Sequence, residues 1–115
     1  ELLCLGQKLR WNAAFPKGAN VTFCYPDAEN SVVARTFERG VEGFTLACGT
    51  GCGCTASILC LRGAVSGQNT RIRMPGGDLF VTLTRTQDGG IRDIFLTGPT
   101  NIVAEGTIRD EDLIL

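Results

Sequence analysis

The sequence predicts an α+β fold in which antiparallel strands curl around one central, buried helix. Most of the 115 residues fall into short runs that alternate apolar and polar side chains, which is typical of half-buried strands. Turns rich in glycine, proline and aspartate separate these runs. One stretch, at about residues 51–61, has instead the small and apolar composition of a helix, with no charge before Arg62. A helix that is apolar on all sides is expected to be buried on nearly all sides.

Seven segments carry the strand pattern. Asp88-Gly89, between two of them, is a hairpin signal. Gly63 follows the helix as a suitable C-terminal cap. The predicted strands are residues 7–11, 20–25, 31–38, 70–73, 78–85, 91–97 and 101–108.

Length and charge restrict the class of protein. Residues 1–115 suit a single domain, which at this size buries roughly two-thirds of its unfolded surface. A net charge of −1 argues against a nucleic-acid partner. No apolar run approaches the ~20 residues that span a bilayer, and no signal peptide is visible, so we expect no membrane partner.

The cysteines favour a reducing compartment. Cys24 lies in an apolar strand pattern, and Cys52, Cys54 and Cys60 lie on the predicted helix among small residues. Free buried cysteines behave as small hydrophobes, so the sequence favours reduced thiols and a cytoplasmic location over a disulfide framework. Zinc bound by Cys48, Cys52 and Cys54 is the other alternative. Structural zinc takes four ligands and the chain has no histidine, so we expect no metal.

The most informative segment is Ala47-Cys48-Gly49-Thr50-Gly51, which leads into the predicted helix. Unpaired N–H groups and the positive end of the dipole at a helix N-terminus favour an anion, including a thiolate. The same N–H groups can bind a substrate carboxylate beside the sulfur. This pattern indicates chemistry at the α-carbon of an amino acid or a similar acid. A buried structural thiol and a phosphate site at the helix start remain alternatives.

A second candidate segment, Glu38-Arg39-Gly40, closes the strand predicted at residues 31–38. Arg39 could bind a carboxylate through two N–H groups, and Glu38 could accept a hydrogen bond from an ammonium group. A solvated ion pair at a strand end is the alternative.

Together these segments resemble the signature of the diaminopimelate epimerase family. The resemblance covers nearly the whole chain, with every motif in the family's order. The matching motifs are Phe15-Pro16, Gly18-Ala19-Asn20-Val21-Thr22-Phe23, Glu38-Arg39-Gly40-Val41, Thr45-Leu46-Ala47-Cys48-Gly49-Thr50-Gly51-Cys52, Met74-Pro75-Gly76-Gly77-Asp78-Leu79, Leu96-Thr97-Gly98-Pro99 and Glu105-Gly106.

The resemblance implies a cofactor-independent amino-acid epimerase with two cysteines on opposite faces of the α-carbon. One cysteine, as a thiolate, removes the α-proton, and the other, as a thiol, returns a proton to the far face. Cys48 would be one of the two catalytic residues. Gly49 and Thr50 would hold the carboxylate of the reacting end through their N–H groups. Asn20, Glu38 and Arg39 would bind the distal end of the amino-acid substrate.

The sequence departs from the family pattern in two ways. The loop usually written ERGxGETxACG has one residue more here, and Phe44 stands where the family has glutamate. The CGNG motif of the other catalytic cysteine and a GNPH motif do not occur in these 115 residues. The resemblance therefore implies a C-terminal lobe that is inactive alone and whose partner, the N-terminal lobe, carries the other cysteine.

Other interpretations stay open. The chain could serve a related racemase, such as a histidine racemase. Proline racemases fit less well, because an Asp-Arg-Ser-Pro type segment directly precedes their second cysteine, whereas Arg39 lies nine residues before Cys48. A non-catalytic binding lobe is the non-enzymatic alternative. A homodimer, in which a second copy replaces the other lobe, is a further one.

Overall fold

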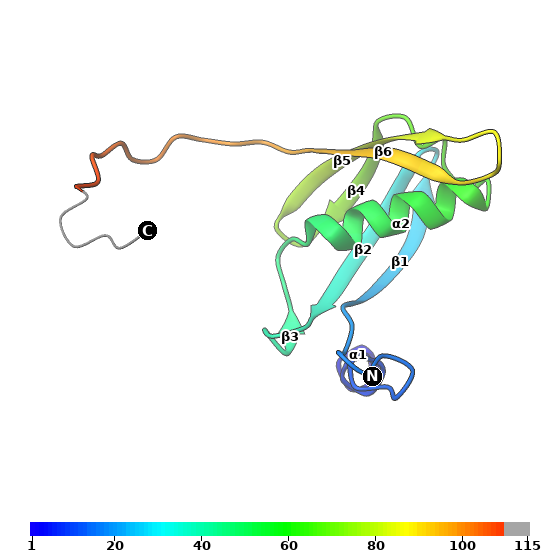
Figure 1. The fold of residues 1–115 in the computed structure, drawn as a ribbon, viewed down its shortest axis with the longest axis horizontal. Helices are drawn as coiled ribbons and strands as arrows, with labels where there is room; N and C mark the ends of the chain where they lie inside the picture. Colours follow the sequence, from blue (N-terminus) through cyan, green and yellow to red (C-terminus); the bar gives the residue numbers. More distant parts are fainter. Residues whose placement is uncertain (110–115) are drawn as a thin grey trace.

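The computed structural model describes residues 1–109 as an α+β fold with one mixed sheet and two helices (Figure 1). The predicted fold class is therefore confirmed. The strand order is β1-β2-β4-β5-β6, and the short β3 pairs with β2 outside this path. The elements are α1 (Leu2–Arg10), β1 (Val21–Ala28), β2 (Ser31–Glu38), β3 (Gly43–Phe44), α2 (Gly49–Leu61), β4 (Thr70–Met74), β5 (Gly77–Arg85) and β6 (Ile91–Thr97).

One strand pair corrects the expectation of an antiparallel sheet. β2 and β4 are parallel, with Val32 opposite Ile72, while the other pairs are antiparallel. Parallel neighbours need a long crossover connection, usually a helix. Here α2 lies in the chain between these two strands and makes that connection.

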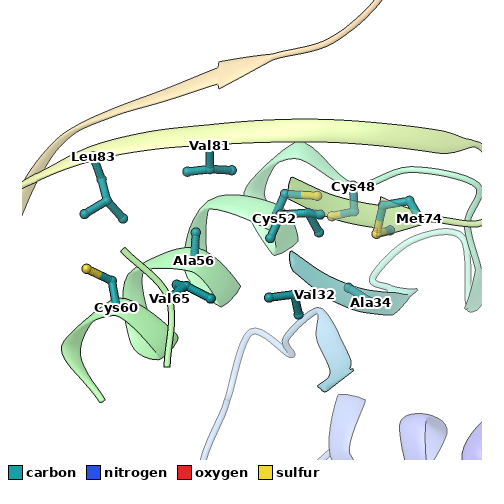
Figure 2. Close-up of a cluster of buried hydrophobic side chains, with 11 residues drawn as sticks. Val32, Ala34, Cys48, Cys52, Ala56, Cys60, Val65, Met74, Val81 and Leu83 are labelled. Carbon is teal, nitrogen blue, oxygen red and sulfur yellow. The ribbon is translucent and has the colours of Figure 1, made fainter. Parts of the chain in front are cut away.

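The core lies between α2 and one face of the sheet. Alternation along β2 turns Val32 and Ala34 toward the helix and leaves Arg35 exposed. In Figure 2, Val81 lies above Ala56 of α2, and Val32 lies to its lower right. Small residues on this side of α2 allow the helix to approach the sheet closely.

Burial of α2 on nearly all sides is not confirmed. The helix packs against β1, β4, β5 and β6, but its opposite side is open, where Ile58 is 53% exposed and Leu61 and Cys54 are also exposed. The reason is that the described sheet ends at β1 and β6, which do not pair with each other.

The N-terminal strand prediction is wrong. Residues 7–11 belong mostly to α1, in which Leu2, Leu5 and Leu9 follow helical spacing. Gly6 of this helix packs against Phe37, on the sheet face that points away from α2, and an added Cβ would lie 3.0 Å from that side chain. Neither helix described in residues 1–109 combines the length and the apolar character of a membrane-spanning segment.

The strand predicted at residues 101–108 is also wrong. After β6 the chain runs away from the sheet without secondary structure, and Ile102 and Val103 are almost fully exposed (Figure 1). A strand needs a neighbour to pair with its backbone groups. Within residues 1–109 this segment has no strand beside it.

Candidate functional site

Cys48 is the N-cap residue of α2, which begins at Gly49, two positions before the predicted start. Its backbone is extended, with φ −146° and ψ 105°, and its carbonyl accepts from the Cys52 N–H at 2.9 Å. Its Sγ replaces the usual capping oxygen and accepts from the Gly51 N–H at 3.4 Å. Cys48 is 5% exposed. The thiol is thus fixed at the helix N-terminus, as the sequence predicts.

Asn20 joins Cys48 to the second candidate segment. Its Nδ2 donates to the Cys48 Sγ at 3.9 Å, and its Oδ1 accepts from the Arg39 N–H at 2.7 Å. The Arg39 guanidinium is exposed and donates from one terminal nitrogen to the Lys17 carbonyl at 3.1 Å. The structure therefore brings Asn20, Arg39 and Cys48 into one hydrogen-bonded chain.

The remaining predicted residues flank this chain. The Thr50 Oγ1 lies 3.4 Å from the Cys48 Sγ. Gly49 and Thr50 form the first turn of α2, where N–H groups have no intrahelical acceptor. Glu38 ends β2, next to Arg39, and its carbonyl accepts from the Val41 and Glu42 N–H groups. All of the predicted residues thus lie near the N-terminus of α2, at the end of β2 or at the start of the loop that follows β2.

The sequence reasoning missed the support beneath the helix N-terminus. The hydroxyl groups of Thr22 and Thr36 lie 2.9 Å apart, on β1 and β2. A Cβ at Gly51 would lie within 2.8 Å of both hydroxyls. Alternation along the two strands could have placed these threonines on the face that meets α2, but it does not show that they touch Gly51.

The reasoning also missed the contact of Glu42 with Arg10. The Glu42 Oε1 accepts from the Arg10 Nε at 3.0 Å and from the Gly40 N–H at 3.1 Å. The Gly40 N–H, and then Arg10, hold the pKa of the Glu42 carboxyl below its ordinary value. No local sequence signal connects positions 10 and 42.

Phe44, the departure from the family pattern, has a packing role. Its ring meets that of Phe37 edge-on, with centroids 6.0 Å apart, and that of Phe23 with centroids 6.2 Å apart. These contacts anchor β3 beside the loop that holds Arg39. The extra loop residue is accommodated within a turn in which Gly40 and Glu42 have positive φ angles of 88° and 58°.

Cys52, one turn after Cys48, is fully buried. Burial, and then the neighbouring Cys48, together raise its pKa to about 11. Cys52 therefore stays a neutral thiol near neutral pH. Among residues 1–109, no group of three or more Cys, Asp or Glu side chains is arranged to hold a metal ion.

The fold and this geometry define a thiol site at the N-terminus of a helix that crosses one face of a mixed sheet. A model of the diaminopimelate epimerase family matches residues 1–103. The chain therefore belongs to the diaminopimelate epimerase family, which is a family of isomerases.

Curated relatives agree with this assignment. The diaminopimelate epimerase of Aquifex aeolicus is 38% identical over 114 residues, which cover 98% of this chain and 40% of the relative. That of Archaeoglobus fulgidus is 34% identical and covers 98% of this chain and 38% of the relative. That of Chlorobaculum tepidum is 38% identical and covers 94% and 41%. The chain thus spans about two-fifths of the length of these relatives.

Proposed function

We propose that this chain is the C-terminal lobe of a diaminopimelate epimerase that interconverts LL- and meso-diaminopimelate. Such a reaction serves the synthesis of lysine and of peptidoglycan precursors. The observation that carries the proposal is Cys48 at the N-cap of α2, hydrogen-bonded to Asn20 and set beside the first-turn N–H groups of Gly49 and Thr50. The free cysteines support a reducing, cytoplasmic location.

In the proposed reaction the Cys48 thiolate takes the α-proton and becomes a thiol. The electron pair left on the α-carbon delocalises into the substrate carboxylate, and the N–H groups of Gly49 and Thr50 stabilise that charge. A thiol on the opposite face then donates its proton to the α-carbon and becomes a thiolate. No cofactor takes part in this scheme. Asn20, Glu38 and Arg39 bind the distal end of the substrate.

The second thiol belongs, in this proposal, to an N-terminal lobe that docks on the open parts of this one. Ile58 and Leu61, the exposed apolar side chains on the open side of α2, support a partner surface there, because exposed apolar patches mark interaction sites. Their burial would also complete the burial of α2. A separate exposed apolar group lies on α1 and just after it, at the opposite face of the sheet: Leu2, Leu3, Leu5, Leu9 and Trp11.

A chimera tests the role of Cys48. In the Aquifex aeolicus relative, this chain replaces the matching 40% of the sequence. We expect epimerisation of LL-diaminopimelate by the chimera, and a loss of about 10²–10⁴-fold in the Cys48→Ala chimera because one acid–base group is removed. Cys54→Ala, on the exposed side of the same helix, is the matched control and should keep activity. A chimera whose activity survives Cys48→Ala contradicts the proposal.

The isolated chain provides the complementary test. We expect no net inversion of LL- or meso-diaminopimelate in D₂O, because only one of the two thiols is present. Inversion by the isolated chain that is lost in Cys48→Ala would instead indicate a homodimer with two facing copies of Cys48. Proton exchange without inversion would show Cys48 acting as a lone base.

A further inference from the structure

The loop that carries Arg39 is tied to α1 by one carboxylate oxygen. Arg10, at the end of α1, is only 5% exposed. Its Nε donates to the Glu42 Oε1 at 3.0 Å, and one terminal nitrogen forms an ion pair with the same oxygen at 2.9 Å. The same oxygen accepts from the Gly40 N–H at 3.1 Å. A single atom of Glu42 therefore joins the helix to the backbone on the far side of Arg39.

The conformation of this loop needs such support. Glu42 has a φ of 58°, in the left-handed region that side chains other than glycine seldom adopt. Gly40 has a φ of 88°. Because the backbone of Glu42 is in an unfavourable region, contacts outside the turn are needed to hold the chain in this conformation.

The supported segment leads directly to the thiol. Arg39 precedes Gly40, and its N–H donates to the Asn20 Oδ1 at 2.7 Å. The other end of the same amide donates to the Cys48 Sγ at 3.9 Å. A shift of the loop would move the Arg39 N–H that holds the Asn20 Oδ1. The Asn20 amide would then turn, and the contact of its Nδ2 with the Cys48 Sγ would weaken.

We infer that Glu42 and Arg10 are positioning residues, which hold Arg39 for the substrate and hold Asn20 against Cys48. The inference rests on the proposed function for the roles of Arg39 in substrate binding and of Cys48 in proton transfer. The contacts that link Arg10, Glu42, Arg39, Asn20 and Cys48 do not depend on that function. A role in stability alone accounts poorly for the pair. The Glu42 side chain is 40% exposed, and an ion pair with an exposed partner contributes little net stability. One terminal nitrogen of Arg10, packed against Gly18, is buried without a hydrogen-bond partner among residues 1–109.

Glu42→Gln in the 115-residue chain tests this inference without substrate. Glu29→Gln, at an exposed position in the turn between β1 and β2, is the control with the same change of charge. Hydrogen exchange by NMR should become about tenfold faster at the Gly40 amide, which loses a charged acceptor, and at the Arg39 amide, whose hydrogen bond to Asn20 weakens as the loop shifts. The amides that pair β4 with β5 should be unchanged and so report an intact fold.

Alkylation of Cys48 supplies a readout that a structural role alone would not move. The ratio of its rate to that of the exposed Cys24 in the same sample, both at about pH 7, reports changes confined to the surroundings of Cys48. We expect Glu42→Gln to lower this ratio about threefold, as the contact of Asn20 with the sulfur weakens, and Glu29→Gln to leave it unchanged. Arg10→Lys, which loses the planar fork but keeps the charge, should act in the same direction.

The inference is overturned if Glu42→Gln changes neither the exchange rates of the Arg39 and Gly40 amides nor the alkylation ratio of Cys48. If Glu42→Gln does not fold, the same two measurements on Arg10→Lys decide the question. Failure of the proposed function has a different signature. In that case the chimera is inactive toward diaminopimelate while Glu42→Gln still changes both readouts.

Discussion

Gly51 lies directly against Thr36: a Cβ added to the glycine would come within 2.7 Å of the Thr36 Oγ1. Thr36 is fully buried, and its hydroxyl is already held by Thr22 at 2.9 Å. The side chain therefore has little room to give way. The N-terminus of α2 reaches its position over the sheet, with Cys48 as its cap, because residue 51 has no side chain.

Two glycines of α2 should respond to alanine in opposite ways. We expect Gly51→Ala to destabilise the chain by about 1–3 kcal/mol through overpacking. At Gly53 an added Cβ would lie 3.5 Å from the Ile94 side chain, an ordinary contact. Gly53→Ala should therefore stabilise by about 0.5–1 kcal/mol, since alanine is the better helix former. Urea unfolding measures both, and equal effects of the two substitutions would contradict the packing argument.

Asn30 offers a test of a hydrogen-bonded junction far from the thiol. Its Oδ1 accepts from the Ser66 N–H at 3.1 Å and from the Thr70 Oγ1 at 2.9 Å, and its Nδ2 donates to the Gln68 carbonyl at 2.9 Å. We expect Asn30→Gly to cost about 1–3 kcal/mol, because the buried Thr70 hydroxyl loses its partner.

Asn30→Ala separates the backbone effect from the lost hydrogen bonds. Asn30 has a φ of 52°, so alanine should cost about 1 kcal/mol more than glycine at this position. Denaturant unfolding of the two variants gives the difference directly. Alanine as stable as glycine would show that the turn changes its conformation when the side chain is removed.

Cys48 should react with iodoacetamide faster than Cys52 near neutral pH. The raised pKa of Cys52, about 11, leaves about one molecule in ten thousand as thiolate at neutral pH. Full burial also shields its sulfur. Peptide-resolved mass spectrometry measures the two rates, and the unfolded chain in urea is the control, in which they should become similar. Equal rates in the folded chain would mean that local unfolding of α2 exposes Cys52 as readily as Cys48 at the N-cap is exposed.

Acid should weaken the chain through carboxylates that are paired in the folded state. The Gly40 N–H and then Arg10 hold the pKa of Glu42 below its ordinary value of 4.5. Hydrogen bonds from Ser31 and then Arg73 hold that of Asp27 below 3.8. Because both folded-state values are lowered, this stability is present above the ordinary values and is lost as the pH falls through the folded ones.

The pH dependence can be assigned by substitution. Unfolding midpoints in urea should fall as the pH drops below about 4.5, and Glu42→Gln and Asp27→Asn should each flatten part of that decline. Asp93→Asn is a suitable control, because Asp93 pairs only with the neighbouring, exposed Arg92 among the residues described. A decline equally steep in both variants and in the control would assign the acid sensitivity elsewhere.

Much of the fold follows from local sequence patterns. Alternation locates the five main strands to within a few residues, and the apolar segment after Cys48 locates α2. Cys48 is found for the same reason, since a helix start is a local feature. α1 is missed because Lys8, Leu9 and Arg10 also alternate in polarity, which hides the helical spacing of the leucines before them.

The remainder depends on contacts between distant segments. The parallel pairing of β2 and β4 cannot be read from either strand, because their patterns fit both directions. Two contacts at the site join residues whose local sequence does not predict them. One is the contact of Gly51 with Thr22 and Thr36, and the other links Gly40 to Glu42 and Arg10. The tail after β6 has the composition of a strand but no neighbour among the described residues.

The parallel pairing also bears on when the site forms during synthesis of the chain. Ser31 pairs with Arg71, so this contact closes a long loop that contains the whole of α2. Closing such a loop lowers the conformational entropy of the chain before the new contacts stabilise it. Folds with many contacts between distant residues therefore form slowly. The β1–β2 hairpin can form early, but the core cluster that buries Cys48 includes Ile72 and Met74 of β4 and is complete only when β4 has left the ribosome. Before that moment the thiol of the nascent chain is less shielded than in the finished fold.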